Sequence, residues 1–585
     1  MVKSTFAKSL SIFPESEKLK GIILIFATLI TSALEALGIS LILPILTLTI
    51  DGNLSRYNFN LEGFLNNFVF FGNISLINKI FFILIFIYVI KNIYLIIYYF
   101  LQNKYSLNIY KIISTKLYKL YLHSNMSFHF DRNSAVLIRN VLVECKNYSS
   151  VINTFIKLIS EVAIFFSITV ALFILRPFET SVSILLVGFS ILILHFITSK
   201  RVENWGKIRQ DTTGFSLKNL QQGLQAIKDV KLKNCETIFV SKYQYQINEF
   251  VKSAYKHNTI SELPKIWLEL VFIIFLPLIL IISPNSLMSN NLDFKEILPT
   301  LGLFVAAIFK LMPSIYRIFS SYQSIVFNKA AIEKLYNEFN SIDFKIKNNY
   351  ERPLRNFSFK NEIELDNVTF KYVSSDKNLL QNFSLKIKKN EIVGLIGTSG
   401  VGKSSLIDLI TGLIEPNKGV VKVDEINIKN NLKGWHNIIG YLPASCYLLD
   451  DTIKNNIAFG IEENDINLDR VVRCAKDAQI YDYIVNLKDK FETMIGERGV
   501  KLSDGQRQRI GIARELYRNN EVLIFDEATS TLDINTENEI LSTLDNLKKS
   551  KTIIIVSHRE NTIKICDRVI NLYVKPYLNY NETKK

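Results

Sequence analysis

Cysteine is scarce in this sequence, which contains only Cys145, Cys235, Cys446, Cys474 and Cys566. Their spacing does not match a metal-ligand pattern, and all five fall in segments expected to lie in the cytoplasm. They are therefore interpreted as reduced thiols and not as a disulfide framework. No cleavable signal peptide is expected either, because the first apolar run is too long for a signal h-region. No internal repeats or low-complexity tracts stand out.

The 585 residues are too many for one domain, and their composition changes sharply along the chain. The first half contains long apolar runs, whereas the second half resembles a soluble α/β domain in its pattern. The formal net charge is +15, which in isolation would suggest nucleic-acid binding. A cytoplasmic excess of Lys and Arg in a membrane protein is the simpler cause. We therefore expect a lipid bilayer and no nucleic acid as partner.

Six apolar segments are long enough to span a bilayer as helices, for which about 20 residues are needed. They lie near residues 21–49, 80–101, 151–175, 180–199, 264–283 and 297–320. The predicted fold class is an all-α transmembrane domain of six helices followed by an α/β domain. The predicted boundaries are residues 1–330 for the transmembrane domain, 331–358 for a polar linker and 359–585 for the α/β domain.

The segments between the predicted spans alternate in charge. Residues 102–150 and 200–263 are rich in Lys and Arg, whereas 50–79, 176–179 and 284–296 contain few cations. The positive-inside rule therefore predicts that both termini and the α/β domain are cytoplasmic.

Three shorter helices are predicted outside the spans. Two transverse helices are expected near residues 133–145 and 217–230, where the basic segments reverse direction, and solvated loops are the alternative. On the outer side, Leu61, Phe64, Leu65 and Phe68 recur at helical spacing. This pattern predicts a short amphipathic helix at the membrane surface, or one packed against its own spans.

A glycine-rich loop between a buried strand and a helix fits the pattern G-x-x-x-x-G-K-[ST]. The backbone N–H groups of such a loop point at the phosphates of a nucleoside triphosphate, and the N-terminus of the helix adds partial positive charge. Lys403 is predicted to reach the β- and γ-phosphates, and Ser404 to bind Mg²⁺. The predicted ATP-binding residues of this loop are Gly397, Thr398, Ser399, Gly400, Val401, Gly402, Lys403, Ser404 and Ser405.

A second buried strand, at residues 521–527, ends in Asp526 and Glu527. Asp526 suits the coordination sphere of Mg²⁺, and Glu527 suits a general base that polarises the attacking water. The alternative is a pair of structural acids at the end of a strand. Tyr372 follows an earlier strand, where its ring is predicted to stack on adenine or simply to pack.

The sequence Leu502-Ser503-Asp504-Gly505-Gln506 precedes a helix and resembles the signature of ATP-binding cassette (ABC) transporters. The segment 556–559 resembles their switch-histidine motif, and 530–533 resembles their D-loop. This resemblance implies that His558 is catalytic, and that Ser503, Gly505 and Gln506 bind the ATP held by a second subunit. Six spans ahead of one cassette resemble the exporter arrangement, which implies a homodimer with ATP and Mg²⁺ as cofactors.

The sequence departs from the family pattern at two positions. Ala444 stands where the family has a glutamine that contacts Mg²⁺ and water, and Asp504 stands where the signature has glycine. An alanine side chain has no oxygen ligand, and a carboxylate near phosphate is repulsive. Either change is expected to slow hydrolysis or to weaken its coupling to the spans.

Charged residues inside the spans are costly and usually functional. The predicted cations of a substrate cavity are Lys91, Lys265, Lys310 and Arg317, and the alternative is pairing with Glu35, Glu161 or Glu269. The segments 262–269 and 310–318 resemble bacterial lipid-linked oligosaccharide flippases of the protein-glycosylation type. The resemblance implies that a polyprenyl-diphosphate glycan is moved across the bacterial inner membrane to the outer leaflet. The alternatives are an exporter of a peptide or another lipid, and a non-hydrolysing regulatory membrane protein.

Overall fold

The computed structural model describes residues 2–40, 76–282, 294–341, 357–372, 377–398, 400–528, 533–572 and 582–584. The chain divides into a helical unit, Met1–Ser124 and Phe128–Asn348, and a second unit that contains Asn349–Lys585. The predicted outer amphipathic helix at 61–68 lies outside the described residues.

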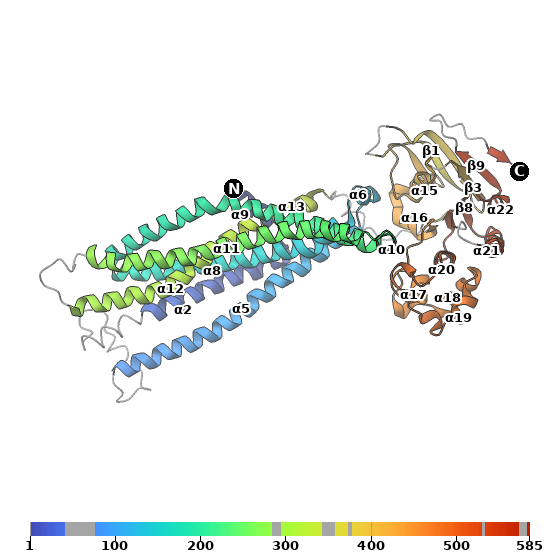
Figure 1. The fold of residues 1–585 in the computed structure, drawn as a ribbon. Coiled ribbons are helices and arrows are strands. Elements are labelled where there is room, and N and C mark those ends of the chain that lie inside the picture. The colour runs from blue at the N-terminus through green and yellow to red at the C-terminus, as the bar shows by residue number, and fades with distance from the viewer. Residues whose placement is uncertain are drawn as a thin grey trace. The chain divides into compact units, whose positions relative to one another are not determined.

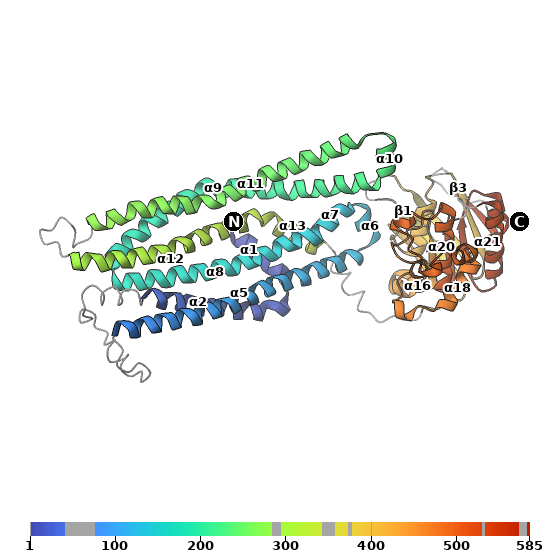
Figure 2. The same cartoon turned by 60° about the horizontal axis from the view of Figure 1, so that its bottom comes forward.

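The helical unit consists of long helices joined by short ones (Figures 1 and 2). The long helices are α2 (Lys18–Ser40), α5 (Leu76–Leu122), α8 (Cys145–Leu175), α9 (Pro177–Gln225), α11 (Glu236–Ile282) and α12 (Phe294–Phe327). The short elements are α1 (Val2–Ile12), η1 (Glu15–Glu17), α6 (Met126–Phe130), α7 (Ser134–Arg139), η3 (Asn140–Glu144), α10 (Ile227–Leu232) and α13 (Lys329–Ser341). The described part of each predicted span falls on one long helix. In both views α9 and α11 run side by side, and α2 lies beside α5 and α8.

Four helical stretches among the described residues are long and apolar enough to cross a membrane: Ile85–Leu122, Ser134–Ile174, Pro177–Gln225 and Phe304–Phe327. The predicted first and fifth spans fall on α2 and α11, whose described parts carry more charge, including Glu35 and Lys265. The exposed side chains of the four apolar stretches include Phe166 on α8 and Phe189 and Phe196 on α9. Large apolar side chains that face outward along a whole helix are typical of contact with lipid.

The predicted transverse helices are displaced. Residues 134–144 form α7 and the π-helical segment η3, which run directly into α8, so the prediction near 133–145 is wrong. The Asn133 side chain accepts a hydrogen bond from Ala135 N, which caps α7 and fixes the start of the long helix. The short helices are instead α6 and α10. Ala226, outside the helical φ/ψ region, ends α9 and separates it from α10.

Helix α13 occupies the first part of the segment predicted as a linker and packs against α1. Its residues Ala331, Ile332 and Leu335 are buried, which explains why a segment with many polar residues is nevertheless ordered. Residues 342–356 lie outside the described residues.

The second unit contains two sheets (Figure 1). The antiparallel sheet has the order β2-β1-β4-β5, from β1 (Glu362–Phe370), β2 (Leu380–Lys388), β4 (Lys418–Val423) and β5 (Ile426–Asn427). The other sheet has the order β10-β9-β3-β8-β7-β6, from β3 (Ile392–Gly397), β6 (Ile439–Leu442), β7 (Val522–Asp526), β8 (Thr552–Val556), β9 (Arg568–Leu572) and β10 (Glu582–Lys584). Its strands pair in parallel except β10, so the loops after β3, β8 and β7 leave from one edge.

Helices surround these sheets and complete the unit. They are α15 (Lys403–Thr411), α16 (Leu432–Ile438), α17 (Ile453–Ile457), α18 (Leu468–Asp477), α19 (Tyr481–Val485), α20 (Asp504–Tyr517), α21 (Ile534–Leu547) and α22 (Glu560–Lys564), with 3₁₀ turns η4 (Ile428–Asn431), η5 (Glu463–Asp465), η6 (Lys490–Glu492) and η7 (Glu497–Gly499). Strands β7 and β8 are buried along their whole length, which is typical of central parallel strands.

Candidate functional site

The loop between β3 and α15 has the backbone conformation that a phosphate cradle needs. Gly400 and Gly402 have φ values of 81° and 105°, a region that residues with a Cβ rarely adopt. Lys403 Nζ donates a hydrogen bond of 2.6 Å to Gly397 O, so the lysine side chain folds back across the loop. The free N–H groups at the start of α15 suit a phosphate group. Ser399, one of the predicted ligands, lies outside the described residues.

The two predicted Mg²⁺ ligands lie together. Ser404 Oγ, in the first turn of α15, donates to Asp526 Oδ2 at the end of β7 over 3.4 Å. Oxygen donors of this kind fit Mg²⁺, which usually takes one or two carboxylates, with waters and substrate phosphates as its other ligands. Over the described ranges, no group of three or more His, Cys, Asp or Glu is arranged to hold a metal ion. Phosphate and water would therefore supply the remaining ligands of a bound Mg²⁺.

Glu527 and His558 meet beside Lys403. His558 Nε2 lies 2.8 Å from Lys403 Nζ and 3.7 Å from Glu527 Oε1. Because an ammonium group can only donate, the first contact requires an unprotonated Nε2 on His558. Glu527 has a positive φ of 52°, and its backbone N donates to Val556 O over 2.9 Å. The backbone thus holds the predicted base at the edge where β7 and β8 end.

Two further groups, which the sequence did not single out, lie beside Asp526. Burial and the charge of Asp526 raise the pKa of Asp408 to about 6. Burial also raises the pKa of the Tyr441 hydroxyl, with Asp526 and Asp408 adding to the effect. The pKa of Asp526 itself is raised by burial and by the neighbouring Glu527. Asp408 follows Ser404 by four residues on α15, so helical spacing was the signal that could have pointed to it.

Tyr372 reaches the same region from the antiparallel sheet. Its hydroxyl lies 2.7 Å from Ser405 Oγ in the first turn of α15, and its ring packs edge-on against Phe370. The ring thus lies beside the phosphate loop, and its stacking on adenine stays a prediction.

The signature residues lie at the N-terminus of α20, which packs against α17, α18 and β6. Ser503 Oγ accepts from Gln506 N, and the Gln506 side chain accepts from Ser503 N over 2.9 Å, so the two form a capping box. Asp504 pairs with Arg507 one turn later, which offsets the carboxylate that replaces glycine. Within the described part of the unit, no hydrogen bond or ion pair joins Ser503, Gly505 or Gln506 to the phosphate loop.

In the helical unit, two of the predicted cavity cations share one carboxylate. Lys91 Nζ on α5 lies 2.7 Å from Glu35 Oε1, and Lys310 Nζ on α12 lies 3.0 Å from Glu35 Oε2. The side chain of Lys91 is only 5 % exposed, that of Glu35 12 % and that of Lys310 37 %. Lys91 Nζ also lies 4.7 Å from the centre of the Tyr88 ring. The cluster joins α2, α5 and α12 and has a net charge of +1 when all three groups are ionised.

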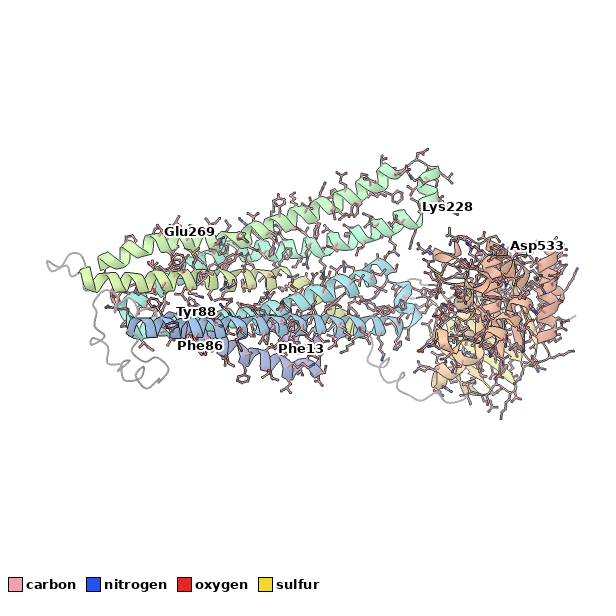
Figure 3. All side chains as sticks on the ribbon, turned by 90° about the horizontal axis from the view of Figure 1, so that it is seen from below. Phe13, Phe86, Tyr88, Lys228, Glu269 and Asp533 are labelled. Carbon is pink, nitrogen blue, oxygen red and sulfur yellow. The ribbon has the colours of Figure 1, made fainter. Side chains whose placement is uncertain are left out.

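The other two predicted cations behave differently from each other. Arg317 Nε on α12 lies 2.6 Å from Glu161 Oε1 on α8, and Ser314 donates to Glu161 Oε2. Lys265 is exposed and makes no ion pair with any described residue. Glu269, on α11, lies across the bundle from Tyr88 on α5 (Figure 3), so it is remote from Lys91. Three of the four cations therefore pair with carboxylates, and none of these pairs involves Glu269.

Comparison with known families identifies both units. Residues 21–311 match the ABC transporter transmembrane region, and residues 380–530 match the ABC transporter family of cassettes. The chain belongs to the ABC transporters. The order of the two matches indicates an ABC exporter whose transmembrane domain is fused ahead of its cassette. This confirms the predicted fold class.

Relatives of this ABC exporter include transporters of several kinds. The chain is 35% identical over 277 residues to the human ATP-binding cassette sub-family B member 5, of which it covers 22%. It is 28% identical over 471 residues to the ATP-dependent lipid A-core flippase of Pasteurella multocida, and that match covers 78% of each chain. The solved structure of a bacterial Atm1-family ABC exporter with ATP bound has the same fold, with a TM-score of 0.74, 20% identity and coverage of 95% and 94% of the two chains.

The cassette family of this exporter couples ATP hydrolysis to transport, as predicted. The close approach of Lys403, Ser404, Asp526, Glu527 and His558 agrees with that activity.

Restoring glutamine at position 444 of this ABC exporter is expected to increase ATP hydrolysis, or its stimulation by substrate, by about 2-fold or more. Ala444 is exposed just after β6, and β6 pairs in parallel with β7, which ends in Asp526. An amide oxygen there would add a ligand for Mg²⁺ or water. The measurement is the ATPase rate with and without lipid substrate, and Ser445→Gln is the matched control. Equal rates in the Ala444→Gln variant and the wild type would show that position 444 does not limit turnover.

Proposed function

We propose that this ABC exporter is a flippase that moves a polyprenyl-diphosphate-linked oligosaccharide, or a similar glycolipid, from the cytoplasmic to the outer leaflet. It would act as a homodimer in the bacterial inner membrane, with both termini and the cassettes in the cytoplasm. ATP and Mg²⁺ would be its cofactors.

The observation that carries this proposal is the cluster of Lys91, Lys310 and Glu35. A single carboxylate between two lysines leaves one positive charge uncompensated where α2, α5 and α12 meet. A diphosphate carries more than one negative charge, and its passage through a medium of low dielectric constant needs cations along the path. Lys265 and Arg317, on α11 and α12, would add to that path.

The homodimer is supported by the position of the signature residues. Ser503, Gly505 and Gln506 lie at the start of α20, and their N–H groups at this helix end suit a phosphate. Among the described residues, no hydrogen bond or ion pair joins them to the phosphate loop of their own chain, which supports a second chain as the source of the loop that they complete. Glu527 would then activate water at an ATP held between two chains, while His558 and Lys403 orient the transferred phosphate.

Another lipid is the second candidate substrate. Relatives that share 78% of their length with this chain are named lipid A-core flippases. Lipid A carries its charge on phosphates as well, so the same cations would serve either substrate. A peptide substrate lacks comparable support.

Replacing Lys310 with alanine is expected to lower flipping of labelled lipid-linked oligosaccharide by about 10-fold or more in proteoliposomes. Lys310 is the more exposed lysine of the cluster. Losing one charge interaction worth about 1.4 kcal/mol corresponds to a 10-fold change in rate. ATP hydrolysis without substrate should stay near the wild-type rate. Lys310→Arg should be tolerated, because arginine keeps the charge and adds a bidentate fork.

The control is Lys111→Ala, which removes an exposed lysine from α5. Flipping and hydrolysis are measured on the same preparations and normalised to folded dimer. A purely structural ion pair predicts a lower folded yield instead, restored by also replacing Glu35. Unchanged flipping in the alanine variants of Lys91, Lys265, Lys310 and Arg317 would rule out the cationic path.

A further inference from the structure

The helical unit contains a cavity that the proposed transport path does not use. Its volume is about 300 Å³, and it lies between α1, α8, α9, α12 and the start of α13. Its apolar walls include Phe155, Leu158 and Ile325, and its charged groups are Lys200, Glu203 and Lys329. A mostly apolar cavity with a few charged groups at one side suits an amphiphilic ligand.

The cavity lies at the depth where three apolar helices become charged. On α9 the apolar run ends at Lys200, and α12 itself ends at Phe327, two residues before Lys329. On α8, Lys157 stands between Phe155 and Leu158. These transitions mark the boundary between membrane and water on the side that carries the basic segments.

One positive charge at the cavity is not compensated. Lys329 Nζ lies 2.9 Å from Glu203 Oε1 and 3.9 Å from Glu333 Oε1, and Lys207 contacts the Glu203 carboxylate at 3.6 Å. Lys200 is exposed and makes no ion pair within the ranges that the structure describes. A cation of this kind beside an apolar cavity attracts the headgroup of an anionic lipid, and the acyl chain of that lipid can enter the cavity.

Helix α1 closes one side of the cavity and presents apolar side chains outward. Thr5 lines the cavity, and the ring of Phe6 packs edge-on against Phe155 with 5.7 Å between the ring centres. Phe6 and Leu10 are nevertheless half exposed, as is typical of a helix that lies along a lipid surface. The cavity therefore lies beside a helix whose outer face suits contact with lipid.

We infer that this cavity binds an anionic phospholipid of the leaflet on the basic side of the membrane. The phosphodiester lies at Lys200 and Lys329, and an acyl chain lies along Phe155, Leu158 and Ile325. This inference goes beyond the proposed function, because the lipid is a resident component of the bilayer and not the transported glycolipid. Such a lipid ties α1 to α8, α9 and α12.

The test is native mass spectrometry of the full-length protein in detergent, titrated with phosphatidylglycerol and, separately, phosphatidylcholine. Wild-type protein should bind phosphatidylglycerol more tightly than phosphatidylcholine. Lys200→Gln should weaken phosphatidylglycerol binding about 5-fold, since a basic residue near an anionic lipid surface contributes about 1 kcal/mol. Lys200→Arg should restore it. Leu158→Trp, which fills the cavity and keeps every charge, should also weaken it.

The matched control is Arg201→Gln, which removes the same charge from the next residue, an exposed side chain that does not line the cavity. Unchanged binding in Arg201→Gln together with loss in Lys200→Gln supports the site. Equal losses in the two variants would show general attraction to anionic lipid and overturn the inference, as would wild-type binding in Lys200→Gln. Because glycolipid flipping is not measured, failure of the proposed function leaves this result unaffected.

Discussion

Replacing Glu527 with glutamine is expected to lower the rate of ATP hydrolysis by about 100-fold or more while leaving ATP binding intact. Glutamine keeps the shape of the side chain but cannot accept a proton from the attacking water. The backbone that places residue 527 is held by the bond from its N–H to Val556 O, which the substitution does not remove. The variant should therefore fold normally and accumulate the ATP-bound state, which in the proposed homodimer is closed.

Two measurements on the same preparation test this expectation: phosphate release and retention of labelled ATP. Glu539→Gln is the matched control, because Glu539 is an exposed residue of α21 whose side chain makes no hydrogen bond or ion pair with any described residue. Wild-type hydrolysis in Glu527→Gln would exclude this residue as the base. Loss of ATP binding would show that it acts on nucleotide affinity instead.

Replacing Glu35 with alanine is expected to destabilise the helical unit by about 3 kcal/mol, because two mostly buried lysines lose their common partner. Loss of Lys310 alone should cost less, since Glu35 and Lys91 would still form a neutral pair. A double variant that lacks both Glu35 and Lys91 should recover part of the loss, since an uncompensated buried cation is then removed.

The free energy of unfolding of these variants can be compared by denaturant titration in detergent. Glu269→Ala is the matched control, because Glu269 is an exposed carboxylate of α11 that makes no ion pair with any described residue. If Glu35→Ala and Glu269→Ala lost the same free energy, the cluster would contribute nothing specific. A double variant less stable than Glu35→Ala would contradict the role of Lys91 as an unpaired cation.

The sequence by itself determined the class of the protein, because its decisive signals are local. A glycine-rich loop between a strand and a helix needs only neighbouring residues to form a phosphate cradle, and Lys403 and Ser404 belong to that loop. Apolar runs predict spans because their length and lack of charge do not depend on what they pack against. Glu527 follows a buried strand whose apolar run marks its end, whereas His558 was expected only from the resemblance to the ABC family.

Local patterns did not locate the short helices of the basic segments. The residues near 133–145 continue into α8 through a π-helical segment, and only the Asn133 cap shows where the helix begins. Polar residues at helical spacing look alike in a transverse helix and in the extension of a span. The difference depends on which neighbouring helices bury Arg139, Asn140 and Glu144.

The tertiary structure decided which distant charges meet. Glu35, Glu161 and Glu269 were equal candidates in the sequence, and packing places Glu35 between Lys91 and Lys310 while Glu269 stays on the far side of the bundle. The strand order that puts β8 between β3 and β7 likewise brings His558 to Lys403, and the fold of α15 places Asp408 beside Asp526. Ion pairs and proton affinities depend on distances between residues far apart in the chain, and only the packed fold sets those distances.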